Sequence, residues 1–357
     1  MNFEIMTKRS SSKIRIGITV GDLNGIGPEL VLKLFSDNRI CELCQPVALG
    51  SKQLFQSLAK TFHFNDLNIS YVNSIEDVKG KSPSVLQVWD EAVEVEFGKE
   101  SYEAGSYALK SLEAAIELLK SESIDAIVTA PINKKTIQSD NFTFPGHTEY
   151  LQSIDKVDQS LMLMISEYAK IGVVTGHIPL SDVKAKLTTE SILSKLSLFN
   201  RSLKEDFGIR KPKIALLGLN PHAGDQGLLG KEEQDIILPA IQQAKTIDIL
   251  AFGPYPADGF FASAAYKNFD GILAMYHDQG LIPAKMLSFR SGVNFTAGLS
   301  FVRTSPDHGT AFDIAGKGIA DESSLRSALY QAIEIVKTRS EWKELHEDVL
   351  QINKSRS

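Results

Sequence analysis

The sequence contains very little cysteine. Cys41 and Cys44 are the only two in 357 residues, and they form a lone Cys-x-x-Cys pair. No second pair is present to complete a zinc site of four sulfurs, and the motif does not open a thioredoxin-like helix after a strand. We therefore expect both side chains to be ordinary reduced thiols.

Long apolar runs and an excess of positive charge are also missing. No run is long and apolar enough to span a bilayer, and residues 1–13 lack the continuous apolar core of a signal peptide. The net charge of -6 disfavours nucleic acid or an anionic membrane as the main partner, because both are bound by an excess of Lys and Arg. The resulting expectation is a cytoplasmic protein with a small-molecule partner.

The chain is longer than one hydrophobic core usually organises, which favours two α/β lobes or one large domain. Strand-like apolar runs alternate with amphipathic segments, a pattern typical of parallel sheets. Strands are predicted at residues 13–20, 47–50, 85–88, 124–130, 171–175, 213–218, 248–252 and 271–275. Helices are predicted at residues 29–35 and 102–120, after a cap at Thr189, and twice more after Asp321.

A glycine-rich turn, residues 21–27, follows the first predicted strand, and Pro28 then stands where a first helical residue should be. Strand, glycine turn and helix can cradle a ligand. The spacing is neither Gly-x-Gly-x-x-Gly nor a P-loop, so it does not indicate a dinucleotide or Walker site. A tight turn before a helix is the alternative interpretation.

Five of the seven histidines lie in predicted loops beside Gly, Pro or Asp. Three of them, His177, His222 and His277, directly follow apolar strands. Imidazoles that converge from three strand ends would make a divalent-metal site with open positions for water or substrate. The alternative is scattered loop histidines that bond to the backbone, and we expect His63 and His346 to be structural or solvated.

Three aspartates, Asp225, Asp258 and Asp278, lie in the same kind of loop. They could support a metal ligand or accept a proton. Turn formation and helix capping are the commoner fates of Asp beside Gly or Pro, and stay open as alternatives.

The densest polar chemistry lies in residues 271–318, where an apolar strand is expected to give way to a loop at His277. Lys285, Asn294 and Arg303 follow, each set among apolar residues. Two fixed positive charges and an amide suit a substrate with a phosphate or carboxylate. A surface role is the alternative, but cations near a core are usually paired, which favours anion binding.

Taken in order over residues 14–320, the motifs resemble those of the 4-hydroxythreonine-4-phosphate dehydrogenase family of pyridoxal phosphate biosynthesis. They are Gly21-Asp22 with Gly25-Ile26-Gly27-Pro28-Glu29, then residues 129–134, 146–149, 176–177, 220–224, 253–258, 276–280, 292–294 and 303–310. Leu23-Asn24 depart from the Pro-Ala that is common in the family, which affects local turn geometry.

The resemblance implies a metal site and a substrate site. His177, His222 and His277 would bind one divalent cation per subunit, and imidazole ligands fit zinc, cobalt or nickel better than magnesium, which stays an alternative. The residues that would hold the phosphorylated substrate are His147, Thr148, Lys285, Asn294 and Arg303. The family is homodimeric, with the metal site between subunits.

A more distant similarity to isocitrate and isopropylmalate dehydrogenases implies the fold and the cofactor region. The fold would be a two-lobed α/β/α architecture with the active site in the interdomain cleft, one lobe formed by residues 1–155 plus 295–357 and the other by residues 156–294. By analogy with those relatives, NAD or NADP would lie against His308, Gly309, Thr310 and Asp313.

The activity implied is the NAD(P)-dependent, metal-assisted oxidation of 4-phosphohydroxy-L-threonine to a 3-oxo acid, which decarboxylates to 3-amino-2-oxopropyl phosphate. Asp258, Asp278 or a metal-bound hydroxide would be the base. A related dehydrogenase of threonate or erythronate 4-phosphate is an alternative. A zinc hydrolase and a non-catalytic metal-binding protein are alternatives from other classes.

Overall fold

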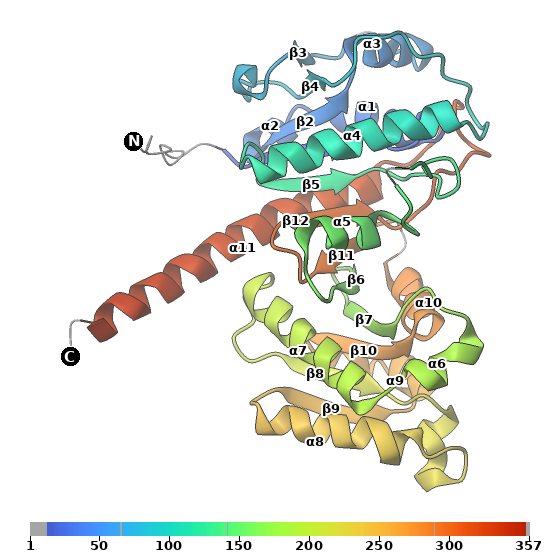
Figure 1. Cartoon of the computed structure of the whole chain (residues 1–357), viewed down its shortest axis with the longest axis vertical. Coiled ribbons are helices and arrows are strands. Elements are labelled where there is room, and N and C mark those ends of the chain that lie inside the picture. The colour runs from blue at the N-terminus through green and yellow to red at the C-terminus, as the bar shows by residue number, and fades with distance from the viewer. Residues whose placement is uncertain (1–12, 65, 141, 289, 355–357) are drawn as a thin grey trace.

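The computed structural model describes residues 13–64, 66–140, 142–288 and 290–354, and the side chains as far as residue 346 (Figure 1). It contains one twelve-stranded sheet in the order β3-β4-β2-β1-β5-β12-β11-β6-β7-β10-β8-β9. The α/β class is therefore confirmed. The proposed lobe boundaries stay a prediction.

The sheet has two parallel blocks. The first consists of β3 (Ser70–Val72), β4 (Ser84–Gln87), β2 (Gln45–Gly50), β1 (Arg15–Thr19), β5 (Ala126–Thr129) and β12 (Val302–Pro306). The second consists of β7 (Lys170–Thr175), β10 (Gly271–Tyr276), β8 (Lys213–Leu217) and β9 (Leu250–Tyr255). The expectation of parallel strands thus holds inside each block.

Two strands that the sequence did not reveal join the blocks. They are β11 (Val293–Ala297) and β6 (Leu161–Ile165), which pair with each other antiparallel. On its other side β11 is antiparallel to β12, and β6 is antiparallel to β7. The last strand in the chain, β12, lies in the first block between β11 and β5, so the early and late chain share one half of the sheet.

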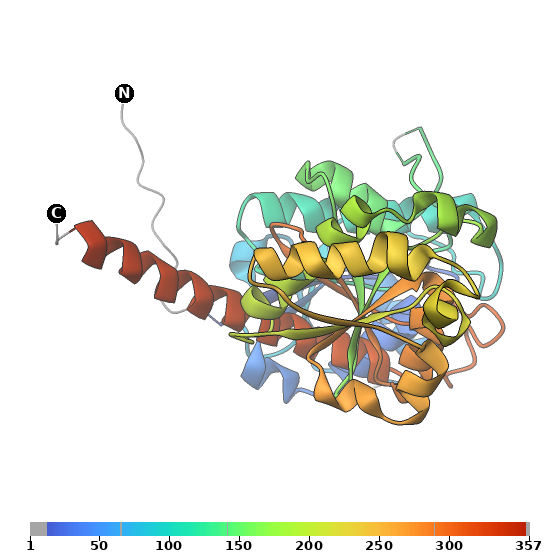
Figure 2. The same ribbon diagram turned by 90° about the horizontal axis from the view of Figure 1, so that it is seen from below.

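Helices cover both sides of the sheet (Figure 2). The α-helices are α1 (Gly27–Phe35), α2 (Ile40–Leu43), α3 (Lys52–Thr61), α4 (Tyr102–Lys120), α5 (His147–Asp155), α6 (Leu180–Lys186), α7 (Thr189–Glu205), α8 (Leu238–Thr246), α9 (Ala257–Ala262), α10 (His277–Leu287) and α11 (Ser323–Lys354). The short turns are η1 (Ile75–Asp77), η2 (Pro221–Gly227), η3 (Glu233–Ile237) and η4 (Ala265–Asn268). Among the described residues, no helix combines the length and apolarity needed to cross a membrane.

Helix α11 corrects the expectation of two helices after Asp321. It is one helix of 32 residues, because no glycine or proline interrupts the stretch from Ser323 to Lys354. Its first half packs against β12 and buries Leu325, Leu329 and Ile333. The second half extends away from the body of the protein (Figures 1 and 2).

Local signals predicted other elements well. Helix α4 has the predicted bounds, and Pro28 lies in the first turn of α1. The cap of α7 is Thr188 and not Thr189, because Thr188 and Ser191 form a reciprocal capping box. Both cysteines are buried free thiols, as predicted, and burial raises the pKa of Cys44 to about 12.

The glycine-rich turn at residues 21–27 supports the tight-turn interpretation. Gly21 has φ +69°, and a Cβ there would lie 2.3 Å from the carbonyl oxygen of Pro131. A Cβ on Gly25 would lie 2.9 Å from the carbonyl oxygen of Thr310, which accepts a hydrogen bond from the Ile26 N–H at 3.0 Å. These glycines let three chain segments pack closely.

Candidate active site

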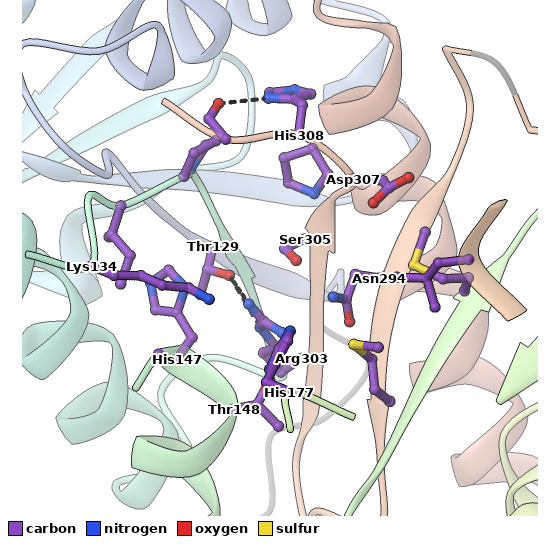
Figure 3. Close-up of a pocket in the computed structure, with 18 of the residues that line it drawn as sticks. Thr129, Lys134, His147, Thr148, His177, Asn294, Arg303, Ser305, Asp307 and His308 are labelled. Atoms are coloured by element: carbon purple, nitrogen blue, oxygen red, sulfur yellow. Dashed lines mark hydrogen bonds between the residues drawn. The ribbon is translucent and has the colours of Figure 1, made fainter. Parts of the chain in front are cut away.

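A cavity of about 310 Å³ lies over the join between the two blocks of the sheet (Figure 3). Its floor is one face of β12, β11 and β6. Arg303 and Ser305 on β12, Asn294 on β11, and Met162 and Met164 on β6 line it. The register explains why these side chains share a face: Asn294 is paired with both Ser305 and Met164, and side chains two residues apart on a strand point the same way.

The walls come from segments far apart in the sequence. The start of α5 supplies His147 and Thr148, and α10 supplies Lys285. All five residues predicted to hold the substrate, which are His147, Thr148, Lys285, Asn294 and Arg303, therefore line one cavity. Thr129, Lys134, Glu149, Ser305 and Asp307 line it too, although sequence reasoning assigned them no role.

Arg303 is the central cation of the cavity and is only 3% exposed. Its Nε and Nη2 donate hydrogen bonds to Thr129 Oγ1 at 3.1 and 2.8 Å, and its Nη1 donates to Thr296 Oγ1 at 3.2 Å. No carboxylate among the described residues forms an ion pair with it. Burial lowers the pKa of Arg303 to about 10, partly offset by Glu149. A buried guanidinium with only neutral partners favours an anionic ligand.

Three buried polar atoms that line the cavity lack a hydrogen-bond partner. They are His147 Nε2, Asn294 Oδ1 and His308 Nε2. Buried polar atoms are nearly always hydrogen-bonded, so these three atoms are groups that a polar ligand or water entering the cavity would satisfy. Burial, Arg303 and Lys134 together hold the pKa of His147 well below its usual value. His147 is therefore a neutral imidazole at pH 7.

A lysine and an aspartate lie together in the cavity wall. Lys285 Nζ lies 3.3 Å from Asp307 Oδ1. Burial raises the pKa of Asp307, and Lys285 opposes that shift. Figure 3 shows Asp307 beside His308, at the opposite end of the view from Thr148 and His177.

Two of the three predicted metal ligands lie together. The rings of His177 and His277 have centroids 5.4 Å apart, and both line the cavity. His277 Nδ1 lies 2.6 Å from Asp278 Oδ1, and His177 Nδ1 lies 3.8 Å from Glu149 Oε1. Each imidazole thus turns its Nδ1 toward a carboxylate, which leaves its Nε2 for a ligand.

His222 lies apart from the other two. It lines a neighbouring hollow with Asp258, and Tyr276 and Asp278 border that hollow. Its backbone in η2 is left-handed, with φ 52°. No group of three His, Cys, Asp or Glu side chains stands ready to hold a metal ion in the part of the chain that the structure describes.

The two aspartates predicted as bases also lie outside the main cavity. Asp278 bonds to His277, and Asp258 faces the hollow beside His222. The expected loop after β10 is absent, because α10 begins directly at His277 and places Asp278 in its first turn. Asp225, the third loop aspartate, belongs to η2.

The four residues predicted to contact the cofactor are divided. His308 and Gly309 line the cavity. Thr310 accepts the hydrogen bond from Ile26 described above, and the side chain of Asp313 is exposed outside the cavity.

Comparison with known proteins identifies the family. The family model described as "Pyridoxal phosphate biosynthetic protein PdxA" matches residues 42–332. A 4-hydroxythreonine-4-phosphate dehydrogenase from Bacteroides thetaiotaomicron is 51% identical over 329 residues, covering 92% of this chain and 90% of the relative. A putative D-threonate 4-phosphate dehydrogenase from Oceanobacillus iheyensis is 40% identical over 337 residues, covering 92% of this chain and all of the relative.

A solved structure agrees with these relatives. The crystal structure of 4-hydroxythreonine-4-phosphate dehydrogenase from Klebsiella pneumoniae superposes with a TM-score of 0.78 at 33% identity, covering 92% of this chain and 99% of that one. Fold and sequence thus agree, and the chain belongs to the family of the pyridoxal phosphate biosynthetic protein PdxA.

Proposed function

We propose that this protein oxidises 4-phosphohydroxy-L-threonine with NAD, giving a 3-oxo acid that decarboxylates to 3-amino-2-oxopropyl phosphate for pyridoxal 5'-phosphate synthesis. The observation that carries the proposal is the buried Arg303, which has no carboxylate partner among the described residues and lies in a cavity with three unpartnered polar atoms. That set fits a small substrate that is both anionic and rich in hydrogen-bonding groups.

The phosphate would lie on the floor of the cavity, against Arg303 and Asn294. A guanidinium can donate paired hydrogen bonds to phosphate oxygens, and Lys285 adds a second charge from the wall. The neutral His147 can donate one N–H without adding charge. Thr148, next to it on α5, supplies a hydroxyl.

A second candidate substrate is threonate 4-phosphate, or erythronate 4-phosphate. The name of the Oceanobacillus iheyensis relative favours it. Threonate 4-phosphate carries a hydroxyl where hydroxythreonine phosphate carries an ammonium group, so the same anion contacts serve both. The relatives are named as dehydrogenases, and no described feature favours a hydrolase or a non-catalytic metal carrier.

We propose that His177 and His277 supply two ligands of a divalent cation. His222, which lines the neighbouring hollow, would have to approach them to supply the third. The free Nε2 atoms of the facing imidazoles fit zinc or cobalt, with magnesium less favoured. When bound, the cation would lower the pKa of the substrate hydroxyl. Asp278 and Glu149 keep the two imidazoles oriented, which gives Asp278 a positioning role in place of the predicted role as base.

The nicotinamide cofactor, NAD or NADP, is proposed to enter at the end of the cavity formed by His308 and Gly309. The unpartnered Nε2 of His308 supports this placement. Thr310 and Asp313 follow on the same segment, and the hydrogen bond from Ile26 to Thr310 fixes its start.

A homodimer with the metal site at its interface is also proposed. Leu180, Ile282 and Met286 are 73%, 59% and 78% exposed, and they border the hollows that hold His177 and His222. Large apolar side chains exposed around a polar site are typical of a protein interface. A cytoplasmic location stays a prediction.

The test is turnover by the purified protein with NAD, measured as NADH formation, on each phosphate ester in turn. We expect the highest kcat/KM with 4-phosphohydroxy-L-threonine and the release of carbon dioxide. Higher kcat/KM with threonate or erythronate 4-phosphate would select the second candidate. No NADH with any of the three would contradict the proposed function.

A further inference from the structure

Among the described residues, only two carboxylates line the main cavity, Glu149 and Asp307. Glu149 faces His177, and that interaction lowers the pKa of Glu149. A carboxylate held as an anion beside a histidine is a weak proton acceptor, because its conjugate acid is destabilised.

Asp307 differs from Glu149 in its setting. Its backbone N–H donates a hydrogen bond to Ser324 Oγ at 3.1 Å, and that hydroxyl donates to the carbonyl oxygen of Gly292 at 2.7 Å. These bonds fix the start of the loop after β12. The Asp307 carboxylate then meets Lys285 from α10. Its position is thus set by Ser324 on one side and Lys285 on the other, while its side chain still lines the cavity.

Asp307 also lies next to His308, at the end of the cavity proposed for the nicotinamide. The charge of His277, one of the two facing histidines, lowers the pKa of Asp307, so the two side chains interact electrostatically. The two aspartates favoured by the sequence do not share this setting, since Asp278 is bonded to His277 and Asp258 lines another hollow.

We propose that Asp307 is the catalytic base that accepts the proton of the substrate C3 hydroxyl, an assignment that rests on the proposed function. The O–H bond breaks and its proton moves to the Asp307 carboxylate. NAD, held at the His308 end of the cavity, would serve as the oxidant that accepts the hydride and electron pair of the C3–H bond, so that the alcohol is oxidised to a ketone as NAD is reduced to NADH. Asp307 then releases the proton to water.

The surroundings of Asp307 determine the expected pH profile. Burial raises the pKa of its carboxyl, whereas Lys285, His308 and His277 lower it. The base works only when ionised, so kcat falls as the pH drops below the pKa of Asp307 in the complex, with a slope of one in log kcat.

The experiment compares the wild type, Asp307→Asn and Asp307→Glu, with 4-phosphohydroxy-L-threonine and NAD, over the pH range in which all three stay folded. We expect kcat of Asp307→Asn to fall by about 100- to 10,000-fold, with a KM within about threefold of the wild-type value. The fall of kcat at acidic pH should also vanish from its pH profile. Asp307→Glu should restore part of kcat and the fall of kcat at acidic pH. The thermal unfolding midpoints of the three proteins should agree, since the backbone hydrogen bond to Ser324 is kept.

Several results would overturn the assignment. One is a kcat for Asp307→Asn within about tenfold of the wild type, or a rise in KM alone, which would mark Asp307 as a support for Lys285. Another is an acidic limb that survives in Asp307→Asn but disappears in Asp258→Asn or Asp278→Asn. Failure of the wild type on every phosphate ester contradicts the proposed function and this assignment together, whereas wild-type turnover with an unaffected Asp307→Asn contradicts only the assignment.

Discussion

Thr129 accepts two hydrogen bonds from the single guanidinium of Arg303, at 3.1 and 2.8 Å. The two residues lie on β5 and β12, which are parallel neighbours in the first block of the sheet. The hydroxyl orients the cation and leaves its charge uncompensated, so a substrate anion meets a guanidinium already turned toward the cavity.

Arg303→Lys should lower kcat/KM for the phosphorylated substrate by about 100-fold, because lysine cannot donate the paired bonds of a guanidinium. Thr129→Val should lower kcat/KM by about tenfold and the free energy of unfolding by about 1–3 kcal/mol, since two buried N–H groups lose their acceptor. Steady-state kinetics and urea unfolding measure both. An Arg303→Lys enzyme with wild-type KM would contradict phosphate binding here.

His147 should make stability depend on pH. The pKa of His147 in the folded protein lies well below the ordinary histidine value of 6.5, so below pH 6.5 the unfolded chain binds more protons than the folded one. Stability from this residue is present above pH 6.5 and is lost as the pH falls, by up to about 1.4 kcal/mol per pH unit. Urea unfolding at about pH 7 and about pH 5.5 should show a smaller loss for His147→Asn than for the wild type. Equal losses of unfolding free energy in the wild type and His147→Asn would argue against a desolvated imidazole at His147.

The proposed metal site predicts graded effects on metal binding. His177→Ala and His277→Ala should each abolish stoichiometric binding of zinc or cobalt, measured by calorimetry and metal analysis. Asp278→Asn should weaken binding by about 10- to 100-fold, because it removes the partner of His277 Nδ1. His63→Asn, at an exposed position with φ 59°, is the matched control and should bind normally. Undiminished affinity in Asp278→Asn would show that it does not orient His277.

An ion pair between Arg339 of α11 and Asp206, the C-cap of α7, should stabilise the packing of these two helices. Arg339 Nε lies 2.6 Å from Asp206 Oδ1, and the side chain of Asp206 is 4% exposed. Arg339→Ala should cost about 2–4 kcal/mol of unfolding free energy, since it leaves a buried carboxylate without its cation. Lys337→Ala removes the exposed pair with Glu334 on the same helix and should cost less than about 0.5 kcal/mol. Equal losses of unfolding free energy in the two variants would show that the ion pair between Arg339 and Asp206 does not stabilise the fold.

The exposed apolar side chains next to the histidines should govern association. Met286→Glu should shift the protein from dimer to monomer in light scattering, and metal affinity should fall with it if the site lies at the interface. Leu345→Glu, on the projecting part of α11, is the control and should leave the dimer intact. A monomeric wild type would contradict the proposed assembly.

Much of the site could be read from the sequence, because its polar residues stand in motifs next to apolar strands. His147, Lys285, Asn294 and Arg303 all reach the same cavity. The floor could not be foreseen. Strands β6, β11 and β12 are short, and the pairing of β6 with β11 and of β12 with β5 joins residues more than 100 positions apart.

The roles of the aspartates illustrate the same limit. Sequence placed Asp258 and Asp278 in site-like loops, but it could not say which hollow each one faces. Asp307 lay inside a recognised motif, yet only the approach of α10 revealed its contact with Lys285. His222 likewise needed the left-handed path of η2 to be known before its distance from the other histidines became apparent.

The floor on β12, β11 and β6 sets the lateral spacing of the substrate contacts in advance. Every floor strand has a hydrogen-bonded neighbour on each side, so Ser305 on β12 and its partner Asn294 on β11 are held at the spacing between strands, about 4.8 Å. The distance between these two contacts is therefore fixed, and a bound ligand cannot change it. The entropy lost on binding then comes from the substrate and from long wall side chains such as Lys134 and Lys285, while the floor is preorganised before the ligand arrives.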